Sequence, residues 1–95
     1  MSREKITVPM ATLEFVKYEE KGLTYFEFDA TQCQPPEPMV NAMNGLKLLK
    51  EKNDRLVGIF FHEPVPLYDR VGVKFAHEAL ELENGDFKII FKLKS

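Results

Sequence analysis

Three residues in two proline-rich segments have side chains that can do chemistry. Cys33 lies in the segment 32–38, and the dipeptide His62-Glu63 opens the segment 62–66. A thiol near an imidazolium and a helix N-terminus has a lowered pKa and can act as a nucleophile. If the two segments meet, a reactive thiol is one interpretation of Cys33, and a role in packing is the favoured one. The alternatives are a cysteine that only fills space and a histidine that only closes its loop through a backbone hydrogen bond.

Other patterns that could hold a metal or a nucleotide are incomplete. Neither His62-Glu63 nor His77-Glu78 is followed by a second histidine one helical turn later, as a zinc protease site requires. The strand pairing described below also places His77 far from Cys33, so the spacing does not favour a zinc site. The 5 glycines are scattered and form no phosphate-binding loop. The sequence predicts no metal, no cofactor and no catalytic residue that can be assigned from the motifs.

Composition limits the class of protein. The 95 residues suffice for a single domain, 1–95, and a formal net charge of −2 disfavours a nucleic-acid-binding protein. One cysteine excludes an intramolecular disulfide and is typical of a reducing compartment. The longest apolar stretch, Leu56 to Phe61, is too short for a membrane span or a signal peptide. We therefore expect a cytoplasmic protein without membrane association.

Two hairpins are predicted at the ends of the chain. Asn84-Gly85 favours a two-residue type I′ turn, which pairs Leu80 with Ile89 and His77 with Lys92 and places His77 on the solvated face. In the N-terminal half, strands at 13–18 and 23–29 flank a four-residue loop at 19–22. That loop opposes Phe15 to Phe26 on the inner face.

The middle of the chain predicts a crossover between parallel strands. A helix begins at Pro36-Glu37-Pro38, because proline is tolerated in a first helical turn. Its apolar positions recur every three to four residues up to Leu49, with Asn41 on the polar side. Gly45 indicates either close packing or a weak midpoint, and Lys50 and Lys52 complement the helix end. The apolar run 56–61 predicts a central strand, and 67–74 predicts a second helix.

The predicted order is β-β-α-β-α-β-β, which describes an α/β (α+β) two-layer sandwich. It has a mixed sheet of four to five strands with both helices on one face. The segments 32–38 and 62–66 leave the carboxyl ends of the parallel strands, where ligands bind in open sheets. Val16, Tyr25 and Ile90 fall on the opposite, open face. They form either an apolar partner surface or scattered residues screened by charged side chains.

The first proline segment resembles a known signature. Asp29 ends a predicted strand and is followed, after a short loop, by Pro35-Pro36-Glu37-Pro38. This arrangement resembles the TusA/SirA-like sulfur-carrier superfamily, whose motif is an Asp, a short loop and Cys-Pro-x-Pro. With Pro36 and Pro38 aligned, Pro35 stands where the family carries its persulfide-bearing cysteine, so the resemblance lends no nucleophile.

The second proline segment resembles one branch of that superfamily, which lacks the carrier cysteine. The branch motif is Asp-His-Asp-Pro-x-Pro-Leu-Tyr, and Glu63 here replaces one acid with another. The other matching positions are His62, Pro64, Pro66, Leu67 and Tyr68. The resemblance covers roughly residues 23–93. It implies a TusA-like core at 23–94 with an additional N-terminal strand at about 12–18.

The resemblance implies a bacterial, cytosolic protein associated with redox or nitrogen-oxide metabolism, in a branch without an established activity. We expect a non-catalytic binding or accessory domain, monomeric or weakly homodimeric, that takes a protein partner or small ligand at the proline segments or the open sheet face. The alternative is a sulfur-relay variant in which Cys33 carries the persulfide. The candidate site residues are Cys33, Pro35, Pro36, Glu37, Pro38, His62, Glu63 and Tyr68.

Overall fold

Two parallel strands, β3 (Leu23–Asp29) and β4 (Asp54–Phe60), lie at the centre of the sheet. The computed structural model describes residues 3–94 and places α1 (Glu37–Leu46) in the crossover between them. β4 forms because residues 56–60 are apolar on both faces of the strand, and Val57 on the face away from the helices is fully buried. The prediction of a central strand here is confirmed.

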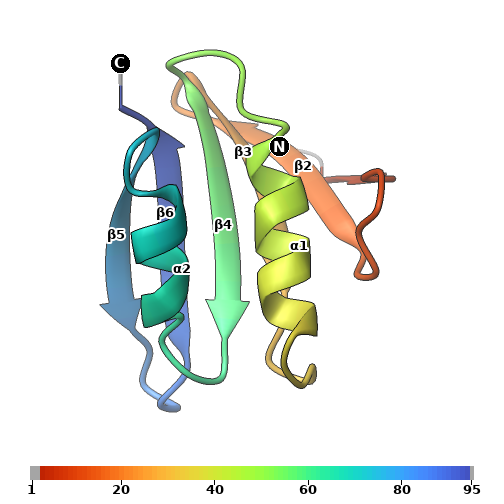
Figure 1. Ribbon diagram of the computed structural model, residues 1–95. Helices are drawn as coiled ribbons and strands as arrows, with labels where there is room; N and C mark the ends of the chain where they lie inside the picture. The colour runs from red at the N-terminus through yellow and green to blue at the C-terminus, as the bar shows by residue number, and fades with distance from the viewer. Residues whose placement is uncertain (1–2, 95) are drawn as a thin grey trace.

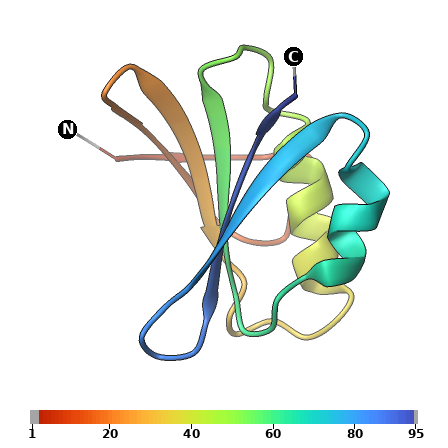
Figure 2. The same cartoon turned by 90° about the vertical axis from the view of Figure 1, so that its left-hand side faces the viewer.

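Hairpin partners extend this pair on both sides (Figure 1). β2 (Phe15–Glu20) pairs antiparallel with β3, and β6 (Phe87–Leu93) pairs antiparallel with β4. β5 (Phe75–Glu81) then forms one edge of the sheet, and α2 (Val65–Val71) connects β4 to it. Figure 2 shows both helices on one side of the sheet. The predicted two-layer sandwich is therefore confirmed, with helices and strands in the expected order.

The sheet has six strands rather than the four to five predicted. The additional strand, β1 (Glu4–Ile6), pairs antiparallel with β2 at the other edge. Its three residues are too few and too polar to show an apolar period, which is why the sequence gives no sign of it. The strand predicted at about 12–18 begins later, at Phe15, because residues 7–14 form an irregular connection.

The N-terminal hairpin closes with the two-residue turn Lys21-Gly22, and the predicted four-residue loop at 19–22 is wrong. Both turn residues have positive φ, 53° and 82°, as a type I′ turn requires. Phe15 consequently stacks on Phe28, with ring centroids 4.9 Å apart, instead of opposing Phe26. Because the register moves by two residues, the predicted inner and outer faces are kept.

The C-terminal hairpin closes with a three-residue loop at 83–85, so the predicted two-residue turn at Asn84-Gly85 is wrong. Only Gly85 has positive φ, 92°, as in a type I turn followed by a bulge. The register moves by one residue, and His77 pairs with Phe91 instead of Lys92. A one-residue shift exchanges the faces of a strand, so His77 lies on the helix-facing side and not on the solvated face.

α1 packs closely against the sheet at Gly45. A Cβ atom there would come within 2.8 Å of Leu56 and 2.9 Å of Phe15, which confirms the predicted close packing. The helix is shorter than its apolar period suggests. Lys50 and Lys52 lie beyond its last turn, so they do not complement its C-terminus as predicted. The chain turns away there, and the backbone N–H of Lys50 donates to the Asp54 carboxylate at 2.8 Å.

Asn41 is fully buried, although the helical period places it on the polar side of α1. Its Oδ1 accepts the backbone N–H groups of Thr12 at 2.8 Å and Leu13 at 3.0 Å. Its Nδ2 donates to Thr12 Oγ1 and to the carbonyl of Glu37, both at 2.9 Å. Every polar atom of the side chain is thus satisfied. These bonds hold Thr12 and Leu13 against α1.

α2 begins at Val65, two residues before the predicted start, because Pro66 fits its first turn. Leu67 and Val71 are buried, as predicted for this helix. Together with α1 and the inner face of the sheet, α2 closes one apolar core. Its largest fully buried apolar side chains on that face are Phe15, Phe28, Phe60, Phe91, Leu56, Leu67 and Ile89. Within residues 3–94, the helices are all too short to cross a membrane.

Candidate functional site

The two proline segments meet at one groove of about 350 Å³, beside the N-terminus of α1. They meet because β3 and β4 run parallel, so their carboxyl ends lie at the same edge of the sheet. The groove includes six of the eight candidate residues predicted from the sequence. It is lined by Ala30, Cys33, Pro35, Pro36, Pro38, Met39, Phe60, Phe61, His62, Glu63, Pro64 and Pro66.

Local hydrogen bonds fix the path of the first segment. Asp29 Oδ1 accepts the backbone N–H of Thr31 at 2.9 Å and its hydroxyl at 2.7 Å, which turns the chain out of β3. The N–H of Ala30 still donates to the carbonyl of Ile59 in β4, at 2.8 Å. The N–H of Cys33 then donates to the Ala30 carbonyl at 3.2 Å. The cysteine is thereby held at the sheet edge, facing the groove.

The Cys33 thiol is half-buried, and its pKa is raised above the ordinary value. Loss of solvation is the main cause, and the carboxylate of Glu37 and the charge of Asp29 add to it. The interpretation of Cys33 as a reactive thiol, with a pKa lowered by a helix dipole and an imidazolium, is therefore wrong. Negative charge surrounds the sulfur, so the thiol form predominates at neutral pH.

Glu37 does not line the groove. It lies in the first turn of α1, and its Oε2 accepts a hydrogen bond of 2.5 Å from the hydroxyl of Thr12. The carboxylate therefore connects the N-terminal segment to the neighbourhood of Cys33. It acts on the groove through the pKa of the Cys33 thiol, which its charge and its hydrogen bonding both raise.

The second segment contributes an exposed aromatic pair. The side chain of Phe61 is 60% exposed, and its ring contacts the imidazole of His62 edge-on with centroids 4.5 Å apart. His62 is also exposed, so both rings border the groove and solvent. The sequence pattern places Phe61 only in the apolar strand. The signal that it belongs to the site is its place at the end of that strand, directly before His62.

Tyr68 lies outside the groove lining but is bound to it through Glu63. Its hydroxyl donates to Glu63 Oε2 at 3.1 Å, and its ring stacks on His77 with centroids 3.6 Å apart. Burial and the neighbouring carboxylate raise the pKa of Tyr68. Glu63 is thus occupied by a structural hydrogen bond. The other polar groups on the groove lining are the Cys33 thiol, the His62 imidazole and the second carboxylate oxygen of Glu63.

The groove is suited to binding rather than to nucleophilic chemistry. Five prolines form much of its wall, and Met39, Phe60 and Phe61 complete an apolar surface. Proline-rich walls lose little conformational entropy when a ligand binds. No positively charged side chain lines the groove among residues 3–94, so an apolar group fits it better than an anion does.

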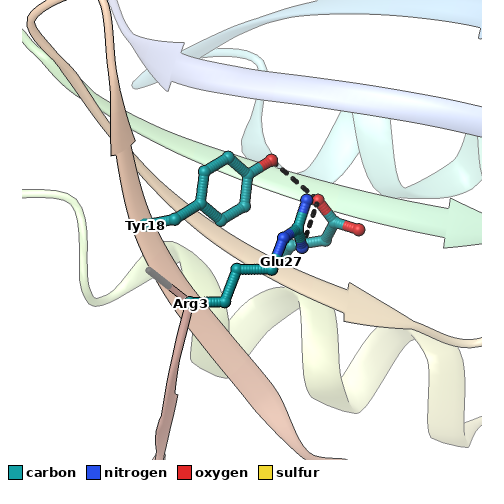
Figure 3. A network of polar contacts seen from close by, with 3 residues as sticks. All are labelled: Arg3, Tyr18 and Glu27. Atoms are coloured by element: carbon teal, nitrogen blue, oxygen red, sulfur yellow. Dashed lines mark hydrogen bonds and ion pairs between the residues drawn. The ribbon is translucent and has the colours of Figure 1, made fainter. Parts of the chain in front are cut away.

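The open face of the sheet is only partly apolar. Tyr18 and Tyr25 stack there, with ring centroids 5.1 Å apart. The hydroxyl of Tyr18 donates to Glu27 Oε1 at 2.8 Å, and the guanidinium of Arg3 lies 4.2 Å above the Tyr18 ring and 3.9 Å from Glu27 (Figure 3). The charged side chains of Arg3 and Glu27 thus cover part of the open face. This agrees with the alternative that its apolar residues are scattered and screened by charged side chains.

Comparison with models of protein families, with curated proteins and with solved structures gives no significant match.

Proposed function

We propose that this protein is a small non-catalytic binding or accessory domain whose groove between the two proline segments receives an apolar, planar group. The observation on which this proposal depends is the groove itself. It has a volume of about 350 Å³, rigid apolar walls and a thiol whose pKa is raised rather than lowered. That volume lies near the lower end of the range for small-molecule sites.

The exposed ring of Phe61 supports the proposal. An apolar ring that is 60% exposed at the border of a concave apolar surface gains free energy when a ligand covers it. The resemblance to the cysteine-lacking branch of the TusA/SirA-like superfamily points the same way, because Pro35 stands at the carrier position. On that resemblance we place the protein in the bacterial cytosol, with a flavin- or haem-containing redox partner as the source of the planar group.

Chemical shift mapping of the full chain tests this function. Flavin mononucleotide and haemin are titrated separately, and we expect saturable shifts at the amides of Cys33, His62 and Glu63. Phe61→Ser removes the exposed ring and is expected to weaken binding about tenfold. Val73→Ser is the matched control, since Val73 is 87% exposed but does not line the groove. The proposal is contradicted if neither flavin mononucleotide nor haemin shifts the amide resonances of either groove segment.

The sulfur-relay alternative is favoured by one observation, the position of Cys33 on the groove. Its reaction transfers the terminal sulfur of a desulfurase persulfide to the Cys33 thiolate, and the desulfurase thiolate is the leaving group. The raised pKa of Cys33 opposes this step because it depletes the thiolate. Incubation with a cysteine desulfurase and cysteine distinguishes the two functions. A mass gain of one sulfur that is absent in Cys33→Ser supports the relay, and no gain supports the binding domain.

A further inference from the structure

β5 is an unpaired edge of the sheet. Leu82 is hydrogen-bonded to Asp86, and Lys74 is hydrogen-bonded to Lys94, at the two ends of the β5–β6 ladder. Because hydrogen-bonded positions alternate along an antiparallel strand, the even-numbered residues of β5 bond to β6 and the odd-numbered ones point outward. Within residues 3–94 no strand lies beyond β5, so the outward N–H and C=O groups have no sheet partner.

This edge is accessible as well as unpaired. All five residues from His77 to Glu81 are exposed on both faces of the strand. Figure 1 shows β5 at the margin of the sheet, with no other element outside it. Proteins commonly protect a long edge strand with charged side chains, lysine above all, with proline or with a bulge. The segment His77-Glu78-Ala79-Leu80-Glu81 contains two glutamates but no lysine, no proline and no irregular pairing.

The side-chain pattern along the edge is self-complementary. If a second copy pairs antiparallel about a two-fold axis at Ala79, the outward backbone groups of three residues on each strand face one another. His77 then lies opposite Glu81 of the second copy on the helix side of the sheet. On the open side Glu78 lies opposite Leu80. Both histidines thus face carboxylates, and no two carboxylates are opposed.

The other symmetric registers are less favourable. An axis at Glu78 or at Glu81 opposes two identical carboxylates. An axis at His77 opposes two imidazoles and leaves Glu81 without a counterpart. With an axis at Leu80, only Ala79 and Glu81 of each strand have outward backbone groups that face outward groups of the other strand. Charge and hydrogen bonding therefore select Ala79.

Tyr68 already holds His77 in place for this contact. The two rings are stacked with centroids 3.6 Å apart and planes 8° apart, and the Tyr68 hydroxyl is fixed by Glu63. A side chain that is ordered before association loses less entropy on binding. We propose that β5 pairs with β5 of a second copy of this chain, about an axis at Ala79, to form a homodimer with one continuous sheet. The proposal is independent of what the groove binds.

Sedimentation of the full chain across a concentration series measures the dimer. His77→Glu replaces each histidine with a residue that repels Glu81 of the partner, and we expect the dissociation constant to rise about tenfold. The double variant His77→Glu/Glu81→His exchanges the two residues, so that each glutamate again lies opposite a histidine, and it is expected to restore dimerisation. Because this variant also lacks the stacked imidazole at position 77, its recovery separates pairing across the axis from loss of the Tyr68 contact.

Cross-linking locates the axis. In a Cys33→Ser background, Ala79→Cys places two thiols opposite each other, and glutathione disulfide is expected to link them at least several-fold faster than it links Leu80→Cys. A protein that stays monomeric up to about 1 mM overturns the proposal. A dimer that is insensitive to His77→Glu, or that links equally fast at both cysteines, also overturns it, because its interface then lies elsewhere.

Discussion

The ring of Tyr68 lies nearly parallel to the imidazole of His77, with 3.6 Å between the centroids. This contact joins α2 to the exposed edge strand β5. It exists only because the three-residue loop at 83–85 moves His77 to the helix-facing side of the sheet. Through the hydroxyl of Tyr68, the same contact reaches Glu63 at the groove.

Tyr68→Phe keeps the stacked ring but loses the hydrogen bond to Glu63, and it is expected to lower the free energy of unfolding by about 1 kcal/mol. Tyr68→Ala also loses the ring contact and is expected to cost about 2–3 kcal/mol. Urea denaturation measures both. If the two variants lose equal stability, the contact between the Tyr68 ring and His77 contributes nothing to the free energy of unfolding.

The raised pKa of Tyr68 predicts a loss of stability in alkali. The unfolded chain releases the phenolic proton first, so the contribution of Tyr68 is fully present below pH of about 10 and is lost as the pH rises further. Tyr68→Phe has no such proton and is expected to show a smaller decline above that pH. Tyr18 has a raised pKa for the same reasons, so Tyr18→Phe is the matched comparison and Tyr18→Phe/Tyr68→Phe should decline least.

Glu37→Gln is expected to lower the pKa of Cys33, because it removes the negative charge that contributes more than Asp29 does to raising it. Alkylation of Cys33 by iodoacetamide at neutral pH should then become a few-fold faster, as more thiolate is present. A profile of rate against pH measures the shift. Glu63→Gln is the control, since Glu63 lines the groove but does not contribute to the raised pKa. Equal acceleration by both variants contradicts the assignment to Glu37.

Asn41→Ala is expected to destabilise the fold by about 2–3 kcal/mol, because it leaves the N–H groups of Thr12 and Leu13 without their acceptor. Asn44→Ala is the control on the same helix. Asn44 is half-buried, and its amide donates to the carbonyls of Val40 and Met10 without accepting a backbone N–H. Thermal and urea unfolding should show a much smaller loss for Asn44→Ala.

Gly45→Ala is expected to destabilise the protein by about 1–2 kcal/mol, although alanine gains about 1 kcal/mol in helix propensity. The added Cβ would lie 2.8 Å from Leu56 Cδ1 and 2.9 Å from Phe15 Cε2, and both side chains are fully buried. Leu56→Ala opens this space. In a Leu56→Ala background the further cost of Gly45→Ala should be smaller, because only the contact with Phe15 remains, and an undiminished cost in urea unfolding would show that crowding against Leu56 is not its cause.

Apolar periodicity predicts the order of helices and strands because it reflects which residues must be buried. It does not predict the register of the hairpins, which depends on one turn residue. Lys21 adopts positive φ although lysine carries no turn signal, and Asn84 does not adopt it although asparagine does. β1 escapes prediction because three mostly polar residues are held by pairing alone.

For the groove, the sequence predicts which segments meet, because prolines mark the ends of two parallel strands. It does not predict the electrostatics of the thiol. The pKa of Cys33 depends on how deeply the sulfur is buried and on the orientation of Glu37, and both are properties of the packed structure. Met39 and Phe60 likewise join the lining only through the way α1 packs against β4.

The hydrogen bond between Thr12 and Glu37 couples two equilibria, the docking of residues 7–13 on α1 and the ionisation of the Cys33 thiol. The docking of residues 7–13 on α1 determines where the Glu37 carboxylate lies, and that carboxylate contributes to the proton affinity of Cys33. Any change that releases the N-terminal segment must therefore change the acidity of the thiol. Conversely, ionisation of the thiol must alter, by the same free energy, how firmly the segment is held.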